Sequence, residues 1–216
     1  MNVAYDHGYQ SNSAFRDAFE KTFGKTPGKG RDADCIVATI FESPVGPLLL
    51  GATAKALCLL EFADRRAIET QVKILRSRFE RSVVTGVNQI LDQAKRELTD
   101  YFAGKFKCFK TPIAYPGTPF QECVWNRLLT IPYGETISYE RLASDIGRAG
   151  AQRAVGTANG ANRIAIIIPC HRVVNKDGKL GGYGGGLWRK QILLDLEQGA
   201  KGTLFDANKM ASAATN

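Results

Sequence analysis

The chain has 216 residues, of which 44% are apolar and 23% charged, an ordinary composition for a folded globular protein that excludes a disordered chain, a collagen and a coiled-coil rod. No stretch approaches the ~20 uninterrupted apolar residues needed to cross a bilayer. Residues 1–7 contain no basic segment followed by an apolar run, so we predict no secretory signal and a cytoplasmic protein.

The formal net charge is +8, and its distribution is uneven. Between Asp145 and Asp177 the sequence contains basic residues but no acidic one. Such a stretch suits binding to a phosphate backbone, and a solvated basic surface is the alternative.

The cysteines indicate reduced thiols. There are five, an odd number, and no pair has the Cys-x-x-Cys spacing. With two histidines in the whole chain, we predict neither a disulfide framework nor a metal site. We interpret four of the cysteines as structural thiols: Cys35, Cys58, Cys108 and Cys123.

Residues 1–30 form a first segment. Phe15, Phe19 and Phe23 recur at helical spacing after Ser13, a suitable N-cap, and they need a partner surface. The run is similar to the second helix-turn-helix of an AraC-type DNA-binding domain. Because the first helix-turn-helix of that module is missing, we interpret 1–30 as a partial remnant and linker.

Residues 31–115 are predicted to form a scaffold domain. Short apolar runs at 35–41, 48–50 and 56–62, separated by turn residues, indicate an antiparallel meander. Helices are expected at 67–79 and 89–103. This half contains no pattern that points to chemistry.

Residues 116–200 are predicted to be mainly helical, followed by a flexible tail at 201–216. Helices are expected at 119–129 and 138–146, and a glycine-containing turn leads from the second to a helix starting at 151. This order is typical of a helix-turn-helix. Its last helix has almost no side-chain bulk, which favours close approach to DNA without extensive base reading.

A cysteine follows the apolar run 164–168, which we predict to be a buried strand. Cys170 there could be an inert core thiol, the commonest state of a free cysteine. Its neighbours His171 and Arg172 offer a base and a cation, which would convert a thiol of pKa ~8.5 into the nucleophilic thiolate.

The run Pro169-Cys-His-Arg-Val-Val174, with Asn162 before it and Gly182-Tyr183 after it, resembles the active-site signature of the O6-alkylguanine-DNA alkyltransferases. The resemblance extends from about 35 to 198 and includes Tyr133-Gly-Glu-x-x-Ser-Tyr139 and Ala151-x-Arg-Ala-Val-Gly156. A partial AraC-type module followed by such a domain is similar to the C-terminal part of bacterial Ada proteins.

The resemblance implies a residue role at each matching position. Cys170 would be the acceptor of the alkyl group, and His171 would take the thiol proton through water. Glu197 would orient His171, and Asn162 would hold the cysteine turn. Tyr139 would donate a proton toward guanine N3.

The resemblance also implies a set of residues that contact DNA or the extruded base. They are Arg153, which would fill the stack left by the base, Val173 with its carbonyl, Tyr183, Gly156, Arg172 and Gly184. At Gly184 the family often carries serine or another larger residue, so the run 184–186 could widen the range of alkyl groups accepted.

The fold class we expect is α/β (α+β). A ribonuclease-H-like scaffold domain with an antiparallel sheet would precede a helical, winged helix-turn-helix alkyltransferase domain. The implied activity is irreversible, single-turnover transfer from guanine O6, and also from thymine O4, to Cys170 after base flipping. No cofactor is implied, because the DNA donates the alkyl group. The expected partner is double-stranded DNA containing alkylated guanine, bound by a monomer. The alternatives are a DNA-binding regulator or non-catalytic lesion reader, and a Cys-His hydrolase.

Overall fold

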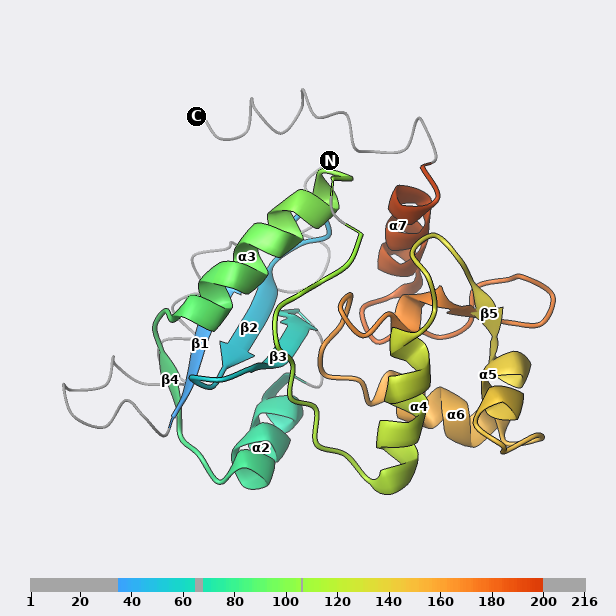
Figure 1. The fold of residues 1–216 in the computed structure, drawn as a ribbon, viewed down its shortest axis with the longest axis horizontal. Helices are drawn as coiled ribbons and strands as arrows, with labels where there is room; N and C mark the ends of the chain where they lie inside the picture. Colours follow the sequence, from blue (N-terminus) through green and yellow to red (C-terminus); the bar gives the residue numbers. More distant parts are fainter. Residues whose placement is uncertain (1–34, 65–67, 106, 200–216) are drawn as a thin grey trace. The chain divides into compact units, whose positions relative to one another are not determined.

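A computed structural model describes residues 35–64, 68–105 and 107–199 of the chain (Figure 1). The expected AraC-like segment and the expected tail therefore lie outside the described residues. The chain divides into two compact units. The first takes in residues up to Glu97 together with 110–116 and 163–165, and the second takes in 98–109, 117–162 and residues from Ile166 onward.

The first unit is built on a four-stranded sheet of order β3-β2-β1-β4. β1 (Ile36–Phe41), β2 (Leu48–Ala52) and β3 (Leu57–Phe62) form the predicted antiparallel meander. β4 (Val83–Thr85) pairs with β1 in parallel, so the sheet also contains one parallel pair, whose strand the sequence did not indicate. A strand of three residues is too short for the alternation of buried and exposed side chains to be recognised in the sequence.

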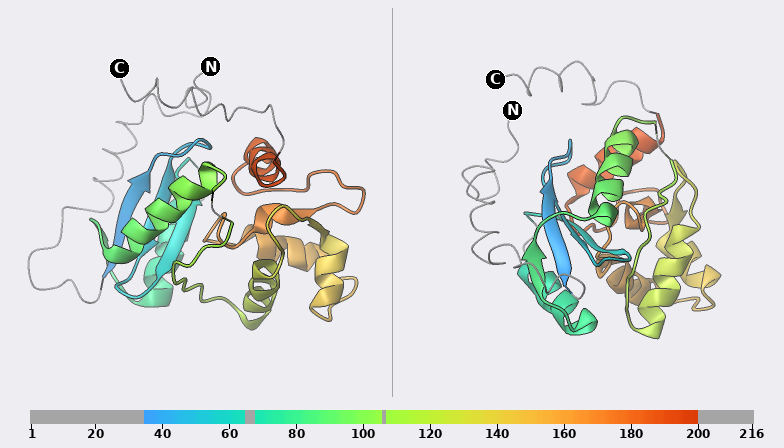
Figure 2. Two further views of the ribbon diagram at one scale, coloured as in Figure 1. Left: turned by 45° about the horizontal axis from the view of Figure 1, so that its top comes forward. Right: turned by 60° about the vertical axis from the view of Figure 1, so that its left-hand side comes forward.

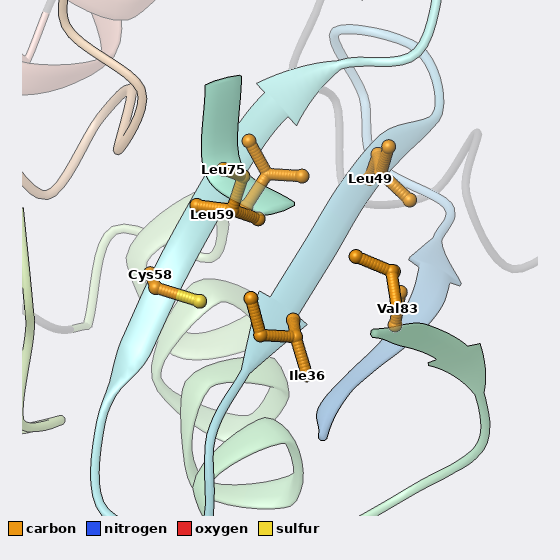
Figure 3. Close-up of a cluster of buried hydrophobic side chains, with 7 residues drawn as sticks. Ile36, Leu49, Cys58, Leu59, Leu75 and Val83 are labelled. Atoms are coloured by element: carbon orange, nitrogen blue, oxygen red, sulfur yellow. The ribbon is translucent and has the colours of Figure 1, made fainter. Parts of the chain in front are cut away.

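Two helices cover the two faces of this sheet (Figures 1 and 2). They are α2 (Ile68–Phe79) and α3 (Gln89–Phe102), as predicted from the sequence. Leu75 of α2 packs against Ile36, Leu59 and their neighbours in a closed apolar cluster (Figure 3). On the other face, Lys95 of α3 reaches Thr39 at 3.3 Å. The last turn of α3, from Leu98, belongs to the second unit.

The second unit carries the helix-turn-helix. Its helices are α4 (Pro119–Leu129), α5 (Tyr139–Asp145), α6 (Gln152–Gly160) and α7 (Leu187–Glu197). Two short parallel strands, β5 (Ile137–Ser138) and β6 (Val173–Val174), pair beside α5. None of the helices in the described part of the chain is long and apolar enough to cross a membrane.

Local chemistry explains how α5 begins and ends. Ser138 caps its start, because the hydroxyl accepts a hydrogen bond from the Arg141 N–H at 3.0 Å. At its end Gly147 adopts φ +69°, and the Arg148 N–H donates to the Ala143 carbonyl at 2.8 Å. This is a Schellman motif, which needs a residue with positive φ and thus favours glycine. The turn then leads directly into α6.

The apolar run 164–168 is buried but is not a strand, so that prediction was wrong. Ile164 makes a single bridge to Leu60, and the following residues turn. Ile166 has φ +71°, a left-handed conformation that a β-branched residue rarely adopts. A continuous run of β-branched residues predicts burial correctly here, but it says nothing about the turn that the cysteine loop requires.

The closed cluster of the first unit generates a stability prediction. Leu59 is 1% exposed, and Leu59→Ala would leave a cavity in the cluster. We expect the free energy of unfolding to fall by about 2–5 kcal/mol in urea titration. The matched control is Val87→Ala at a 68% exposed position, where a change within about 0.5 kcal/mol is expected. Equal effects of the two variants would contradict this description of the core.

Candidate active site

The cysteine loop is held in a tight turn by its own backbone. The Cys170 N–H donates to the Ile168 carbonyl at 2.8 Å across Pro169, which has φ −81° and ψ 61°. These angles are those of an inverse γ-turn, and the proline ring fixes φ near the required value. Cys170 then opens a single 3-10 turn, Cys170–Arg172, which leads into β6.

Two asparagines of the α6 region fasten this turn. Asn162 donates from Nδ2 to the Ile168 carbonyl at 2.8 Å and to Cys170 Sγ at 3.1 Å. Asn159 donates to the Cys170 carbonyl at 3.3 Å. Asn162 thus contacts the sulfur directly, a contact that favours the thiolate because a hydrogen bond to a charged acceptor is stronger than one to a neutral acceptor.

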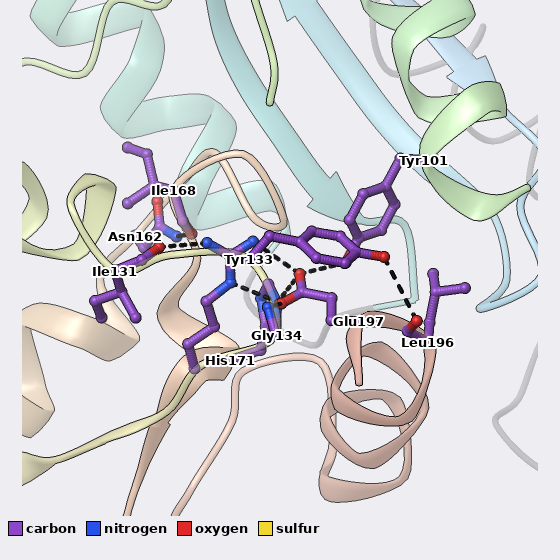
Figure 4. A network of polar contacts seen from close by, with 10 residues as sticks. Tyr101, Ile131, Tyr133, Gly134, Asn162, Ile168, His171, Leu196 and Glu197 are labelled. Atoms are coloured by element: carbon purple, nitrogen blue, oxygen red, sulfur yellow. Dashed lines mark hydrogen bonds and ion pairs between the residues drawn. The ribbon is translucent and has the colours of Figure 1, made fainter. Parts of the chain in front are cut away.

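The imidazole beside the cysteine is completely buried and pairs with a carboxylate (Figure 4). His171 Nε2 lies 2.8 Å from Glu197 Oε1. Burial lowers the pKa of His171, although Glu197 opposes this effect. Because an ionised carboxylate can only accept, the neutral ring carries its proton on Nε2, and Nδ1 is left as the basic atom. Among the described residues nothing hydrogen-bonds Nδ1, which is buried.

Glu197 is the centre of this network. Burial alone would raise its pKa, but hydrogen bonds from His171 and Arg172 outweigh that effect and hold the pKa well below its usual range. Arg172 donates from Nε to Oε2 at 2.7 Å and from Nη2 to Oε1 at 2.9 Å. The Gly134 N–H adds a bond of 3.2 Å, and the Tyr101 hydroxyl one of 2.7 Å.

Arg172 requires a correction. The sequence led us to expect contact with DNA or the base, but the side chain is 7% exposed and its guanidinium binds Glu197 and the Ile131 carbonyl. A cation bound in this way on the inside of the protein supports the carboxylate and does not present itself to a phosphate. Sequence adjacency to Cys170 gave no information about which way the side chain points.

A groove of about 740 Å³ lies between α5, α6 and the loop after β6. Five residues predicted to contribute to catalysis or to base and DNA binding line it: Tyr139, Arg153, Gly156, Tyr183 and Gly184. Cys170 does not line the groove but retains 6% of its surface. Burial and the neighbouring Cys170 both raise the pKa of Tyr139, which therefore keeps its proton.

Val173, the remaining predicted base contact, is fully buried, and its carbonyl accepts from Lys190 Nζ. The sequence did not point to Lys190, because a lysine side chain is rarely buried. Lys190 lies two helical turns before Glu197 and therefore on the same face of α7, and this spacing was the feature of the sequence that could have indicated its burial. Burial lowers the pKa of Lys190 to about 8, which the nearby Cys170 partly opposes.

The other cysteines fall into two groups. Cys35 and Cys58 are buried, as expected for structural thiols, and burial raises the pKa of Cys58 to about 12. Cys108 and Cys123 are exposed, so their interpretation as structural thiols is not supported. Within the described residues no three His, Cys, Asp or Glu side chains gather in a way that could hold a metal ion.

Comparison with known proteins decides the family. Residues 36–115 match the family model described as the 6-O-methylguanine DNA methyltransferase, ribonuclease-like domain, and residues 119–199 match the corresponding DNA binding domain. This chain belongs to the 6-O-methylguanine DNA methyltransferase family. The family match confirms the expected fold class, a ribonuclease-like sheet domain followed by a helical DNA-binding domain.

Members of this family resemble the chain over most of its length. The methylated-DNA--protein-cysteine methyltransferase of Mycobacterium tuberculosis is 45% identical over 76% of this chain and 96% of its own. The Methanosarcina barkeri protein of that name is 44% identical over 74% of this chain and 95% of its own. The crystal structure of Mycobacterium tuberculosis OGT in complex with DNA superposes with a TM-score of 0.66, covering 79% of this chain and 99% of that one, at 44% identity.

The packing around Tyr139 yields a prediction with a matched control. A Cβ on Gly181 would lie 2.7 Å from the Tyr139 ring and 2.9 Å from Asn175, whereas a Cβ on Gly182 would meet nothing within 4 Å. Gly181→Ala must therefore displace the Tyr139 ring. We expect single-turnover alkyl transfer to slow by about 100-fold, because Tyr139 is the proton donor expected from the sequence and a misplacement of such a group by about 1 Å has that effect. Gly182→Ala should transfer at the parental rate, and equal rates for the two variants would contradict this role of Gly181.

Proposed function

We propose that this member of the family repairs DNA by moving an alkyl group from guanine O6 to Cys170, once per molecule. The observation that carries the proposal is the contact of Asn162 with a cysteine sulfur whose neighbour in sequence, His171, is paired with a buried carboxylate. Curated relatives named as methylated-DNA--protein-cysteine methyltransferases, at about 45% identity over nearly their whole length, support the same reaction.

Activation of the thiol would use the free ring nitrogen of His171. A water molecule between Cys170 Sγ and His171 Nδ1 would pass the thiol proton to the imidazole, and Glu197 would stabilise the imidazolium that forms. Lys190, whose ammonium group lies near the sulfur, would stabilise the thiolate electrostatically. The thiolate then attacks the alkyl carbon, so that a carbon–sulfur bond forms as the bond to O6 breaks.

The departing guanine needs a proton, and Tyr139 would supply it at N3. Its raised pKa keeps the phenol protonated, and Gly156 and Gly181 lie close to its ring. The Val173 carbonyl has a second lone pair beside its bond to Lys190 and would accept from the guanine amino group. The backbone N–H of Gly184 would donate to O6. A thioether has no easy route back, so each molecule acts once.

The alkylated base must leave the duplex to reach this sulfur, because O6 faces the interior of the stack. The small residues of α6, among them Gly156, would let the helix approach the minor groove closely. Arg153 is an exposed long side chain on this helix. Arg153 would occupy the gap left by the base. The extruded base would enter from the groove, past Tyr139 and Tyr183.

Further expectations from the sequence are part of this proposal. The protein would also accept alkyl groups from thymine O4 and would act as a monomer in the cytoplasm. The chain would divide into four parts, with boundaries at residues 30, 115 and 200. Its N-terminal segment would be an AraC-like remnant, as in the C-terminal part of Ada proteins. The crystal structure of a relative with DNA supports DNA as the partner. Within residues 35–64, 68–105 and 107–199, no feature favours a regulator, a non-catalytic reader or a hydrolase.

The central test is the mass of the intact protein after incubation with an oligonucleotide containing O6-methylguanine. We expect a gain of one methyl group per molecule, located on the peptide that contains Cys170, with no further turnover. Cys170→Ser should gain nothing, and Cys123→Ser, at an exposed thiol, should behave as the parent. Methylation of another residue, or repeated turnover, would overturn the proposal.

The glycines at the mouth of the groove predict broad alkyl acceptance. Gly184 lines the groove and is exposed, and a side chain there would narrow the entrance. We expect Gly184→Ser to lower the single-turnover rate on benzylguanine relative to methylguanine by about tenfold, the discrimination that one or two pocket atoms provide. An unchanged ratio of the two rates would show that the glycine run does not set the preference.

A further inference from the structure

The buried hydroxyl of Tyr101 has no role in the mechanism described above, although it touches the catalytic network. It donates to Glu197 Oε1 at 2.7 Å (Figure 4). Tyr101 lies in the last turn of α3, 96 residues away from Glu197 in sequence, and is fully buried. Burial raises the pKa of Tyr101 well above its usual value, and Glu197 raises it further, so the phenol stays protonated and can act only as a donor toward the carboxylate.

The ring of Tyr101 is fixed by its neighbours. It packs edge-on against Phe102 at 5.3 Å and Tyr133 at 6.1 Å between ring centroids, and tilted against Phe109 at 5.4 Å. A ring enclosed on three sides holds its hydroxyl in one place. The hydrogen bond is therefore preorganised, and Glu197 Oε1 meets it in a defined position.

Glu197 Oε1 accepts from three groups at once. Besides Tyr101 they are His171 Nε2 at 2.8 Å and Arg172 Nη2 at 2.9 Å. Donors that share one oxygen compete for its electron density, so each weakens the hold of the others. The less strongly Oε1 holds the His171 proton donor, the less the imidazolium form is stabilised, and the lower the pKa of His171 becomes.

We propose that Tyr101 is a positioning residue for the transfer reaction: by donating to Glu197 Oε1 it sets the orientation of the carboxylate and keeps His171 in the neutral form that can accept a proton. The inference rests on the proposed function, since a neutral base is needed only if the thiol must be deprotonated. The proposal thus adds Tyr101, a residue of α3, to the group formed by Cys170, His171, Arg172 and Glu197.

The test uses Tyr101→Phe in the full chain, with Tyr133→Phe as the matched control. Both changes remove one hydroxyl from neighbouring rings, but the Tyr133 hydroxyl bonds the Leu196 carbonyl at 3.4 Å and not the carboxylate. In Tyr101→Phe the His171 Nε2–H proton should move downfield in the NMR spectrum. The acidic limb of the single-turnover rate should move up by about 0.5 on the pH scale, which makes transfer about threefold slower below it.

The sign of this shift separates the role from simple packing. A merely structural hydroxyl would lower the melting temperature and leave both the His171 resonance and the acidic limb in place, and that result would overturn the proposal. Equal shifts in Tyr133→Phe would overturn it too. The NMR measurement needs no DNA, so it tests Tyr101 even if the parent protein fails to gain a methyl group, the result that would instead overturn the proposed function.

A measurement on the unaltered protein covers the case in which Tyr101→Phe does not fold. The Tyr101 hydroxyl proton should then be observed as a slowly exchanging resonance with a nuclear Overhauser effect to the His171 ring. A hydroxyl proton that exchanges with bulk water at the rate of an exposed tyrosine would overturn the proposal.

Discussion

A single buried carboxylate organises the second unit. Glu197 sits at the end of α7 with 5% of its surface exposed, and a charged carboxylate in that position is tolerable only when it is paired and hydrogen-bonded. Its four donor residues come from three separate parts of the chain: the end of α3, the turn before β5, and the neighbours His171 and Arg172 after the cysteine. Removing one partner would leave buried charge uncompensated, so the network is a constraint on folding as well as on chemistry.

The cysteine turn is a second constraint and a strained one. Ile166 with φ +71° lies four residues before Cys170, and a left-handed β-branched residue costs about 1–3 kcal/mol. The surrounding bonds oppose that cost, since Asn162 and the inverse γ-turn at Pro169 both hold the Ile168 carbonyl. The backbone geometry thus fixes the position of the sulfur, which is the preorganisation that the proposed acceptor role of Cys170 requires.

The sequence predicted those parts of the fold that repeat. The first three strands, with their apolar runs, and the helices from α2 to α5 were found to within a few residues, as was the start of α6. The three-residue β4 and the turn at 164–168 were not, because both are determined by tertiary pairing and not by periodicity. Patterns of hydrophobicity encode burial, and burial alone does not determine whether a buried run is extended.

The site was predictable where the residues form one contiguous signature, and less so elsewhere. Cys170 and His171 follow from adjacency together with a family resemblance. Lys190 and Tyr101 were missed because their significance lies in what the fold places beside them. Arg172 was expected to contact DNA or the base because of the resemblance, whereas the fold turns its side chain toward Glu197. The charge and the type of a residue suggest it as a candidate for the site, but the direction in which its side chain points is determined by the fold.

The connection between α4 and α5 has a mechanical consequence. Arg172 holds the Ile131 carbonyl while Glu197 holds the Gly134 N–H, so both ends of this short bend are attached to the ion pair. The bend leads directly into the helices that would face the duplex. The position of the bend, and with it the start of α5, is therefore coupled through two hydrogen bonds to the carboxylate that pairs with His171, so a displacement of one requires a displacement of the other.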